Sequence, residues 1–444
     1  MTKAQYFRAA TLIAVALAVA GCSVLHRGKH ATTPVLGERI AVLTTEGDAQ
    51  VDPALADTPM TLPDPVANAD WAQSGGNASK SMGHVTLGAT VAQAWEVQGG
   101  RGSSMTMRLA SAPIVANGRV YTIDSLGAVR SFDIRNGGQI WASQTPDDKG
   151  NENSLYGGGI AYDNGRIYAT NGLGYVSALD ERSGGIVWKV KPGGPLRGAP
   201  TVADGTVYVM SQDNQLYSLK ETDGTTNWSA AASLEIAGIF GSASPAVAQG
   251  TIVAGFSSGE LNAYRYENGR QVWQDTLQST SVRTSVSSLS DIDADPVIDN
   301  GQVFSIGEGG RMVALELTSG QRQWELNIAG IATPWVAGDW VFVLADGGKL
   351  LCVQRMTGHI RWIAQLPQFQ HPKSKKDQIA YTGPILAGGR LVVAGSNGVI
   401  VNIDPATGSY QSQTRVGAGI GVRPVVAGST LYVFDNAGRL HAFR

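Results

Sequence analysis

The sequence ALDERSGGIVWKV, residues 178–190, decides the fold because its spacing returns along the chain: a turn glycine, Gly184, stands four residues before a tryptophan, Trp188. Five further copies have both residues, and a seventh keeps the glycine, Gly408, but has Ser412 in place of tryptophan. The five further copies pair Gly137 with Trp141, Gly224 with Trp228, Gly269 with Trp273, Gly320 with Trp324 and Gly358 with Trp362.

A second motif precedes each copy and consists of a proline, a short apolar stretch, a glycine turn and another apolar stretch. It occurs eight times, with Ile160 at the proline position of the second occurrence. The prolines are Pro113, Pro200, Pro245, Pro296, Pro334, Pro384 and Pro424. Both motifs repeat at the same successive intervals of 47, 40, 45, 51, 38 and 50 residues, so they belong to one unit. A period of this size indicates a propeller or a solenoid.

Each unit is predicted to form four antiparallel strands. Its apolar runs are short and rich in β-branched and aromatic residues, and they are separated by pairs such as Asn-Gly and Asp-Gly, which suit tight hairpins. In the second unit we expect strands over residues 158–163, 166–171, 174–180 and 185–190. No stretch has a sustained helical period, which argues against helical repeats. The sequence therefore predicts an all-β, eight-bladed β-propeller, whose tryptophans bury their rings against the neighbouring blade.

The two ends of the repeat region complement each other. The last unit stops at RLHAFR, residues 439–444, and lacks the strand that carries the tryptophan. Near the start, TVAQAWEVQGG carries an orphan tryptophan, Trp95, with no unit before it. We expect the strand of Trp95 to complete the last blade, which closes the ring at eight blades and leaves no long unpaired edge. Rings of seven or nine blades fit these counts less well.

The N-terminus has the features of a secretory signal, predicted to span residues 1–21. Lys3 and Arg8 precede an apolar run that is too short for a stable membrane span. The following VAGC resembles the lipobox of bacterial lipoproteins, in which the cysteine, here Cys22, is lipidated and becomes the first residue of the mature chain. By the same resemblance, Ser23 favours transfer to the outer membrane. The alternative is an ordinary signal peptide that happens to end in cysteine.

Composition divides the mature chain into residues 22–66, rich in Pro, Ala, Asp and Thr and expected to be a flexible tether, and residues 67–444, the predicted propeller. Without the signal peptide the chain has 32 basic and 36 acidic residues, a net charge of −4. This balance gives no indication of nucleic-acid binding.

The sequence offers little for catalysis or metal binding. Its six histidines are scattered, and its two cysteines are Cys22 and Cys352, of which the second is expected to be a small buried side chain. In SLSDIDADPV, three aspartates mimic the start of a calcium loop, but Pro296 and Gln302 stand where an EF-hand needs Gly and Glu. This acidic stretch is either a solvated loop or a binding loop. HPKSKK, residues 371–376, is expected to be a solvated protrusion that could touch a partner or lipid headgroups.

The repeat ALD…SGxxxW resembles the one shared by pyrroloquinoline-quinone (PQQ) dehydrogenases and by the BamB family of lipoproteins of the outer-membrane β-barrel assembly machine. The resemblance covers residues 70–444. A quinoprotein enzyme would be expected to have an adjacent cysteine pair, calcium-binding residues and a catalytic aspartate. This chain has no adjacent cysteines, and with its lipobox and its eight-fold array of units of about 40–50 residues it is more similar to the BamB family, which implies no enzymatic activity and no cofactor.

Two local matches imply a partner-binding site. GGPLRGAPTV resembles the family loop whose Leu-Arg pair contacts the barrel-assembly protein BamA, which places this role on Leu196 and Arg197. LSDIDADPV resembles a second family loop, which places an acidic role on Asp291 and Asp293. The family tends to have a further leucine two residues before the Leu-Arg pair, and Gly194 stands there instead.

The resemblance therefore implies a lipid-anchored scaffold at the outer membrane that faces the periplasm, binds the POTRA domains of BamA within the assembly complex, and helps unfolded outer-membrane proteins to fold and insert. Binding of such clients by strand addition is less favoured, because closed blades leave few free edges. Two alternatives remain: a PQQ-dependent dehydrogenase, and a module that binds sugar or peptide ligands in the central channel. Aromatic residues at the channel mouth would support the second.

Overall fold

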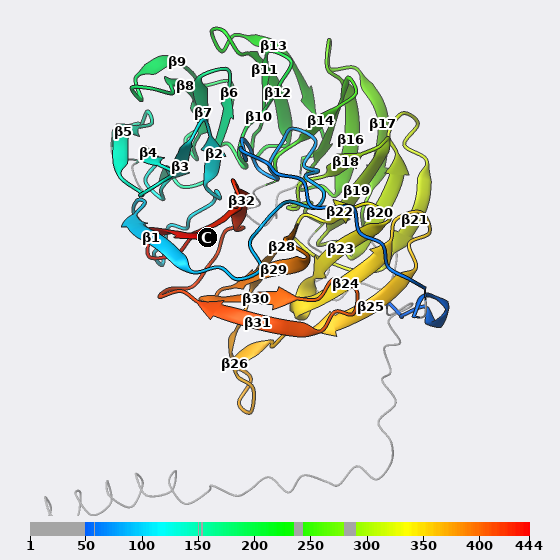
Figure 1. Ribbon diagram of the computed structural model, residues 1–444. Coiled ribbons are helices and arrows are strands. Elements are labelled where there is room, and N and C mark those ends of the chain that lie inside the picture. Colours follow the sequence, from blue (N-terminus) through cyan, green and yellow to red (C-terminus); the bar gives the residue numbers. More distant parts are fainter. Residues whose placement is uncertain (1–48, 57, 150, 152–153, 235–242, 279–289) are drawn as a thin grey trace, which may run out of the picture. The chain divides into compact units, whose positions relative to one another are not determined.

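The computed structural model describes residues 49–444, with the exception of residues 57, 150, 152–153, 235–242 and 279–289. These residues form eight sheets of four antiparallel strands each, arranged as the blades of a ring (Figure 1). No helix among them is long and apolar enough to span a membrane. The predicted all-β, eight-bladed propeller is therefore confirmed.

The first four blades follow one another in sequence. Blade I consists of β2 (Ile114–Ala116), β3 (Arg119–Ile123), β4 (Ala128–Asp133) and β5 (Gln139–Gln144). Blade II consists of β6 (Ile160–Asp163), β7 (Arg166–Thr170), β8 (Val176–Asp180) and β9 (Ile186–Val190). Blade III consists of β10 (Thr201–Ala203), β11 (Thr206–Met210), β12 (Gln215–Lys220) and β13 (Thr226–Ala231). Blade IV consists of β14 (Ala246–Ala248), β15 (Thr251–Gly255), β16 (Glu260–Arg265) and β17 (Gln271–Thr276).

The remaining blades include the closure of the ring. Blade V consists of β18 (Val297–Asp299), β19 (Gln302–Gly307), β20 (Arg311–Glu316) and β21 (Arg322–Leu326). Blade VI consists of β22 (Trp335–Ala337), β23 (Trp340–Ala345), β24 (Lys349–Gln354) and β25 (Ile360–Gln365). Blade VII consists of β28 (Tyr381–Ala387), β29 (Arg390–Gly395), β30 (Val399–Ile403) and β31 (Tyr410–Arg415). Blade VIII consists of β32 (Val425–Ala427), β33 (Thr430–Phe434), β34 (Arg439–Phe443) and, from the other end of the chain, β1 (Gln93–Gln98).

Three short elements lie outside the blades. The hairpin of β26 (Phe369–His371) and β27 (Lys376–Gln378) separates blades VI and VII in the sequence. Single 3-10 turns form at η2 (Pro53–Leu55) and η4 (Asp346–Gly348).

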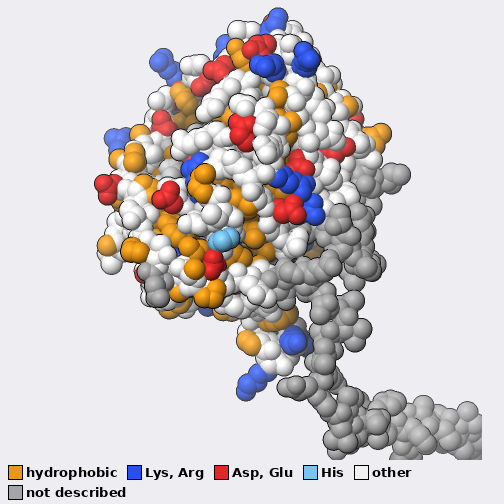
Figure 2. Space-filling view, turned by 90° about the vertical axis from the view of Figure 1, so that its right-hand side faces the viewer, with side chains coloured by type: hydrophobic (Ala, Val, Ile, Leu, Met, Phe, Trp, Pro, Cys, Tyr) orange, Lys and Arg blue, Asp and Glu red, His pale blue; other side chains and the backbone are white. Residues whose placement is uncertain are grey.

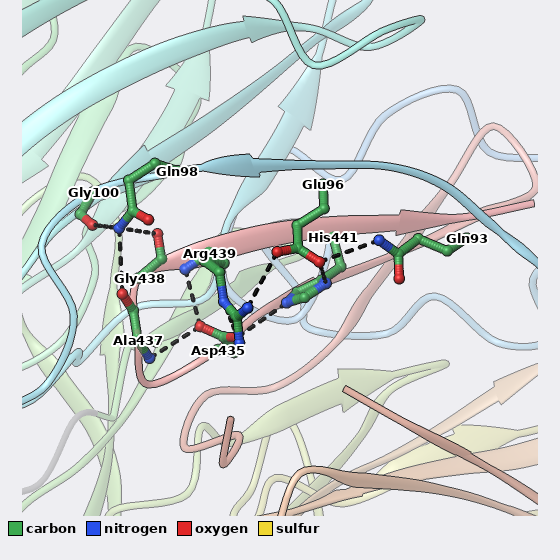
Figure 3. Close-up of polar contacts among 9 residues, drawn as sticks. All are labelled: Gln93, Glu96, Gln98, Gly100, Asp435, Ala437, Gly438, Arg439 and His441. Carbon is green, nitrogen blue, oxygen red and sulfur yellow. Dashed lines mark hydrogen bonds and ion pairs between the residues drawn. The ribbon is translucent and has the colours of Figure 1, made fainter. Parts of the chain in front are cut away.

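The closure of the ring occurs as the sequence predicted. β1 pairs antiparallel with β34, so Trp95 lies opposite Ala442. Polar contacts reinforce this pairing (Figure 3): Glu96 contacts Arg439 at 3.2 Å and His441 at 3.3 Å. Gln98, at the end of β1, donates from Nε2 to carbonyl groups of the turn before β34.

The ring has two different faces, which follow from the alternating direction of the strands. At one end of each blade lie the turns between the first and second strands and between the third and fourth strands; we call this the turn face, exemplified by residues 117–118 and 134–138 of blade I. At the other end lie the turn between the second and third strands and the link to the next blade. We call this the loop face, exemplified by residues 124–127 and 191–200.

The repeated tryptophans lock neighbouring blades together at the turn face. The ring of Trp141 lies against Gly184 of the next blade, where an added Cβ would come within 2.6 Å of it. Its Nε1 donates to the carbonyl of Glu181, three residues before that glycine, at 2.8 Å. The same two contacts recur at seven interfaces, formed by Trp95, Trp141, Trp188, Trp228, Trp273, Trp324 and Trp362. Each tryptophan thus requires a glycine in the following blade, which explains the spacing of the repeat.

The eighth interface, between blades VII and VIII, is built differently. Its tryptophan position holds Ser412, and blade VIII offers no glycine turn there because the chain ends after its third strand. The segment that leads into β1 fastens this interface instead: Arg390 of blade VII donates to the Gly88 carbonyl at 2.7 Å, and Leu87 is buried beside it. The serine therefore stands at the one interface that has no receptor for a tryptophan.

Residues 68–85 lie across the centre of the turn face, where the dark blue chain crosses the ring in Figure 1. Their hydrogen bonds reach the first strand of every blade. The partners in blades I to VIII are Val115, Tyr162, Val202, Val247, Ile298, Trp335, Leu386 and Val426. This N-terminal segment closes that end of the central channel and ties the eight inner strands to one another.

The chain contacts the ring earlier than the predicted end of the tether at residue 66. Val51 bridges to Ile360 at the start of β25, and Arg361 donates to the carbonyl groups of Leu55 and Thr58. Composition did not indicate this docking, because the contacts use backbone groups and need no apolar periodicity.

Candidate functional site

Leu196 and Arg197 lie in the link between blades II and III, on the loop face. Leu196 bridges to Ser211 beyond the end of β11 and is fully buried between the two blades. The backbone N–H of Arg197 donates to the Met210 carbonyl at 2.9 Å, and its own carbonyl accepts from Gly158 at 2.8 Å. Both side chains are therefore held in fixed positions, and only 3% of Arg197 is exposed.

Asp291 and Asp293 lie in the link between blades IV and V, on the same face. Ile292 between them is completely buried against Gly255, and its N–H donates to the Phe256 carbonyl at 3.2 Å. This anchor turns the two flanking carboxylates in the same direction, and both are buried. The solvated-loop interpretation of this acidic stretch is therefore wrong, because the link is drawn into the blade interface rather than lying on the surface.

The structure brings these two links together across blade IV. Nη2 of Arg197 lies 2.9 Å from Oδ1 of Asp293 and 3.5 Å from Oδ1 of Asp291. Burial raises the pKa of Asp293 to about 6, an effect that the Arg197 charge opposes and the Asp291 charge reinforces. Three of the four residues that the sequence singled out thus form one buried ionic cluster. The fourth, Leu196, precedes Arg197 and is buried between blades II and III.

Two further carboxylates belong to this region of the loop face and were missed by the sequence analysis. Burial, together with the nearby carboxylates of Asp346, Asp293 and Asp291, raises the pKa of Glu308 to about 7. Burial also raises the pKa of Asp346. A signal was present: both acids precede a Gly-Gly pair at the same turn of adjacent units.

The cluster is suited to binding rather than to bond making. Together with Glu308 and Asp346, the described residues of the cluster place four carboxylates near the guanidinium of Arg197, whose Nη1 is buried and has no hydrogen-bond partner among the described residues. Such an unpaired buried donor costs free energy. No group of three or more His, Cys, Asp or Glu side chains in the described part of the chain is arranged to hold a metal ion.

The central channel is the site of the alternative in which the propeller binds sugar or peptide ligands. At its turn-face end Trp71 stacks on Trp335, with ring centroids 5.9 Å apart, and both rings are buried. From the same N-terminal segment, Ser74 donates to Asp295 at 2.6 Å and Lys80 donates to Thr201 at 2.9 Å. Burial lowers the pKa of Lys80 to about 8. The aromatic residues at this end of the channel therefore pack the N-terminal segment against the ring, and both are buried.

The residues present do not fit a quinone cofactor of the dehydrogenase type. The adjacent cysteine pair of such enzymes has no counterpart, since Cys352 lies alone in β24, where it is fully buried and its burial raises the pKa of its thiol. The expectation of a small buried side chain is thus confirmed. The predicted lipidation site, Cys22, lies outside the described residues.

The comparisons with known proteins agree with the sequence resemblance. A family described as "Outer membrane protein assembly factor BamB" matches residues 85–156 and 153–364. A BamB from Yersinia pestis is 26% identical over 329 residues, which cover 73% of this chain and 81% of the relative.

Two solved structures share the fold. The crystal structure of BamB from Moraxella catarrhalis superposes with a TM-score of 0.67 at 18% identity and covers 80% of this chain and all of that one. The quinohemoprotein alcohol dehydrogenase from Comamonas testosteroni gives 0.63 at 14% identity, covering 84% of this chain and 80% of that one. At these identities the structures support the propeller architecture alone.

Proposed function

The chain belongs to the family of the outer membrane protein assembly factor BamB, and from this premise we propose that it is a non-enzymatic scaffold that binds BamA in the assembly of outer-membrane β-barrel proteins. The observation that carries the proposal is the ionic cluster of Arg197, Asp291 and Asp293, because it joins two links of the loop face that the sequence resemblance separately associates with partner binding.

The burial of these residues defines how they would act. Leu196 and Arg197 form the fixed base of the link, while residues 191–195 in front of them are partly or fully exposed. The cluster therefore holds a surface loop in a defined position, as rigid binding sites on propellers require. We propose that a POTRA domain of BamA docks on the exposed residues 191–195 of this loop.

Substitution of the cluster tests this site. Removing the arginine takes from the buried carboxylate of Asp293 the guanidinium that lies 2.9 Å from it, which we expect to destabilise the loop by about 3–5 kcal/mol. Arg197→Ala should therefore abolish the co-purification of BamA with the tagged chain from membranes. Asp293→Asn keeps the shape of the side chain and should weaken the co-purification without unfolding the ring.

The matched control is Arg130→Ala. Arg130 pairs with the buried Asp124 at 2.5 Å on the same face, in the second-to-third turn of blade I. It removes the same type of charge from a site that no resemblance connects with BamA. Equal loss of BamA with Arg130→Ala and Arg197→Ala, or full retention with Arg197→Ala and Asp293→Asn, would reject the proposed site.

We also propose that lipid attached to Cys22 anchors the chain to the outer membrane, with the ring in the periplasm. The support is the lipobox-like VAGC directly after an apolar signal core. Cys22→Ser should move the protein from the membrane fraction to the soluble periplasmic fraction. Retention of this variant in membranes of cells that lack BamA would contradict a lipid anchor.

A further inference from the structure

The hairpin of β26 and β27 projects beyond the ring, below β31 in Figure 1. It is the one pair of strands in the described part of the chain that belongs to no blade. Its base is fixed, since Ile379 is buried and donates to the Gln368 carbonyl at 2.8 Å. Residues 370–378 beyond this base are all exposed, so the tip is held away from the propeller by an ordered stem.

The tip concentrates positive charge on a chain whose formal net charge is −2. Lys373, Lys375 and Lys376 stand within four residues, and none of them forms an ion pair with a residue that the structure describes. The one carboxylate of the tip, Asp377, lies 3.3 Å from Nε2 of His371 instead. Figure 2 shows Lys and Arg side chains at the end of the projection, apart from the acidic side chains on the ring.

The backbone at this tip places a lysine in a conformation that side chains disfavour. Lys375 has a φ of 48°, in the left-handed region that a side chain disfavours. The other tight turns of the ring mostly place Gly or Asn in this conformation, for example Asn117 and Gly118 in blade I. A lysine at such a position carries a conformational cost that a glycine would avoid. Asp377, two residues later, has the same conformation with a φ of 57°, so this tip holds two charged side chains where glycine would be less strained.

The hairpin and the start of the described chain both adjoin β25 of blade VI. Val51 pairs with Ile360 at one end of β25, and the other end of β25 leads into the hairpin. If Cys22 carries the lipid of the proposed function, at most about 90–100 Å of extended chain joins it to Ala49. The described chain thus meets the ring at blade VI, the blade that precedes the hairpin.

We propose that the lysines of this hairpin dock on the anionic phosphates of phospholipid headgroups, so that the ring contacts the membrane at blade VI in addition to its anchor. A lysine near an anionic bilayer contributes about fivefold to partitioning, and three give on the order of 100-fold. This attraction is screened by salt. The docking orients the ring, because a second attachment to the membrane beside the lipid restricts its rotation.

The test uses the unlipidated Cys22→Ser chain, so that the anchor plays no part in it, and sedimentation with vesicles. The chain should sediment with vesicles of phosphatidylcholine containing about a third of phosphatidylglycerol, and not with phosphatidylcholine alone. Adding Lys373→Gln, Lys375→Gln and Lys376→Gln should lower this binding by on the order of 100-fold. High salt should have a similar effect on the chain with its lysines intact.

The matched control removes three exposed cations from blades II, III and IV, as Lys189→Gln, Lys220→Gln and Arg270→Gln. It changes the net charge equally and should leave vesicle binding within about twofold. Equal losses in both triple variants, or equal binding to both kinds of vesicle, would overturn the proposal. So would unchanged vesicle binding combined with loss of BamA in the hairpin variant, since the tip would then bind an acidic protein. Loss of BamA after Arg197→Ala tests the proposed function separately.

Discussion

The turn face and the loop face belong to the same eight blades but differ in how strictly they repeat. On the turn face the connection between the third and fourth strands has five residues in blades I to VI. The fourth of them is always the lock glycine, the one that lies against the tryptophan of the preceding blade. On the loop face the links between blades range from eight residues (327–334) to twenty (277–296). The regular turn face thus packs neighbouring blades against each other. The loop face, whose links vary in length, carries the ionic cluster and the basic hairpin.

The comparison predicts that damage to the turn face reduces stability throughout the ring. Trp141 is buried, contacts Gly184 and Tyr121, and donates to a carbonyl of the next blade. Trp141→Ala should lower the free energy of unfolding by about 3–5 kcal/mol, measured by chemical denaturation. Well below the new melting temperature, BamA should still co-purify, since the loop face is distant from this contact. Loss of BamA without loss of stability would contradict the division between the faces.

The free-energy cost of replacing a lock glycine has two parts, one from the backbone conformation and one from the clash with the tryptophan ring. Gly184 and Gly205 both have a φ of 73°, but an added Cβ at Gly184 would meet Trp141 at 2.6 Å, whereas at Gly205 no atom lies within 4 Å. Gly205→Ala should lose only the backbone contribution, about 1–2 kcal/mol. Gly184→Ala should lose about 1–3 kcal/mol more, through the clash with the ring. Equal losses would show that the glycine is retained for its φ alone.

The difference between the regular turn face and the variable loop face also explains how much of the fold could be predicted from the sequence. A glycine and a tryptophan four residues apart are visible because the lock recurs, and the orphan Trp95 together with the missing last strand indicated the closure. The path of residues 68–85 could not be predicted, since most of its hydrogen bonds to the blades use backbone groups that any sequence supplies.

The site was predictable only in part. Leu196, Arg197, Asp291 and Asp293 were found through a resemblance, and their roles in partner binding stay predictions. Their mutual contact joins links 94 positions or more apart in the sequence, so no local pattern contains it. The Gly-Gly pair that follows Glu308 marks its turn in the sequence, but its raised pKa arises from burial and from carboxylates that only the folded chain brings near it.

Acid should affect the two faces in opposite directions. The folded pKa of Asp293, raised to about 6, and that of Glu308, raised to about 7, exceed the values near 4 of an unfolded chain. Their contribution to stability is therefore complete below pH 4 and is lost as the pH rises through 6 to 7. Asp133 and Glu316 end β4 and β20, just before turn-face connections, and hydrogen bonds lower their pKa values to about 2, so their contribution is lost as the pH falls from 4 towards 2.

Hydrogen exchange can measure this contrast. Between pH 7.5 and 5.5, after correction for the intrinsic rate, amides of residues 290–310 should become more protected and those of residues 133–138 should not change. Asp293→Asn should remove part of the effect, because an amide side chain does not titrate. A decrease in protection of residues 290–310 over this range would show that Arg197 keeps the carboxylates ionised.

The smallest effect is expected at the interface that lacks a lock. A repeat consensus suggests that Ser412→Trp would stabilise the ring by restoring the missing residue. The structure predicts otherwise, because the receptor in the next blade is a glycine turn between the third and fourth strands, and in blade VIII no turn joins these two strands, β34 (Arg439–Phe443) and β1 (Gln93–Gln98). We expect a change within about 0.5 kcal/mol, as for an ordinary surface substitution. A gain of 2 kcal/mol or more in the free energy of unfolding would mean that the tryptophan joins blades without its glycine. The regularity of the turn face would then depend on the tryptophan side chain alone.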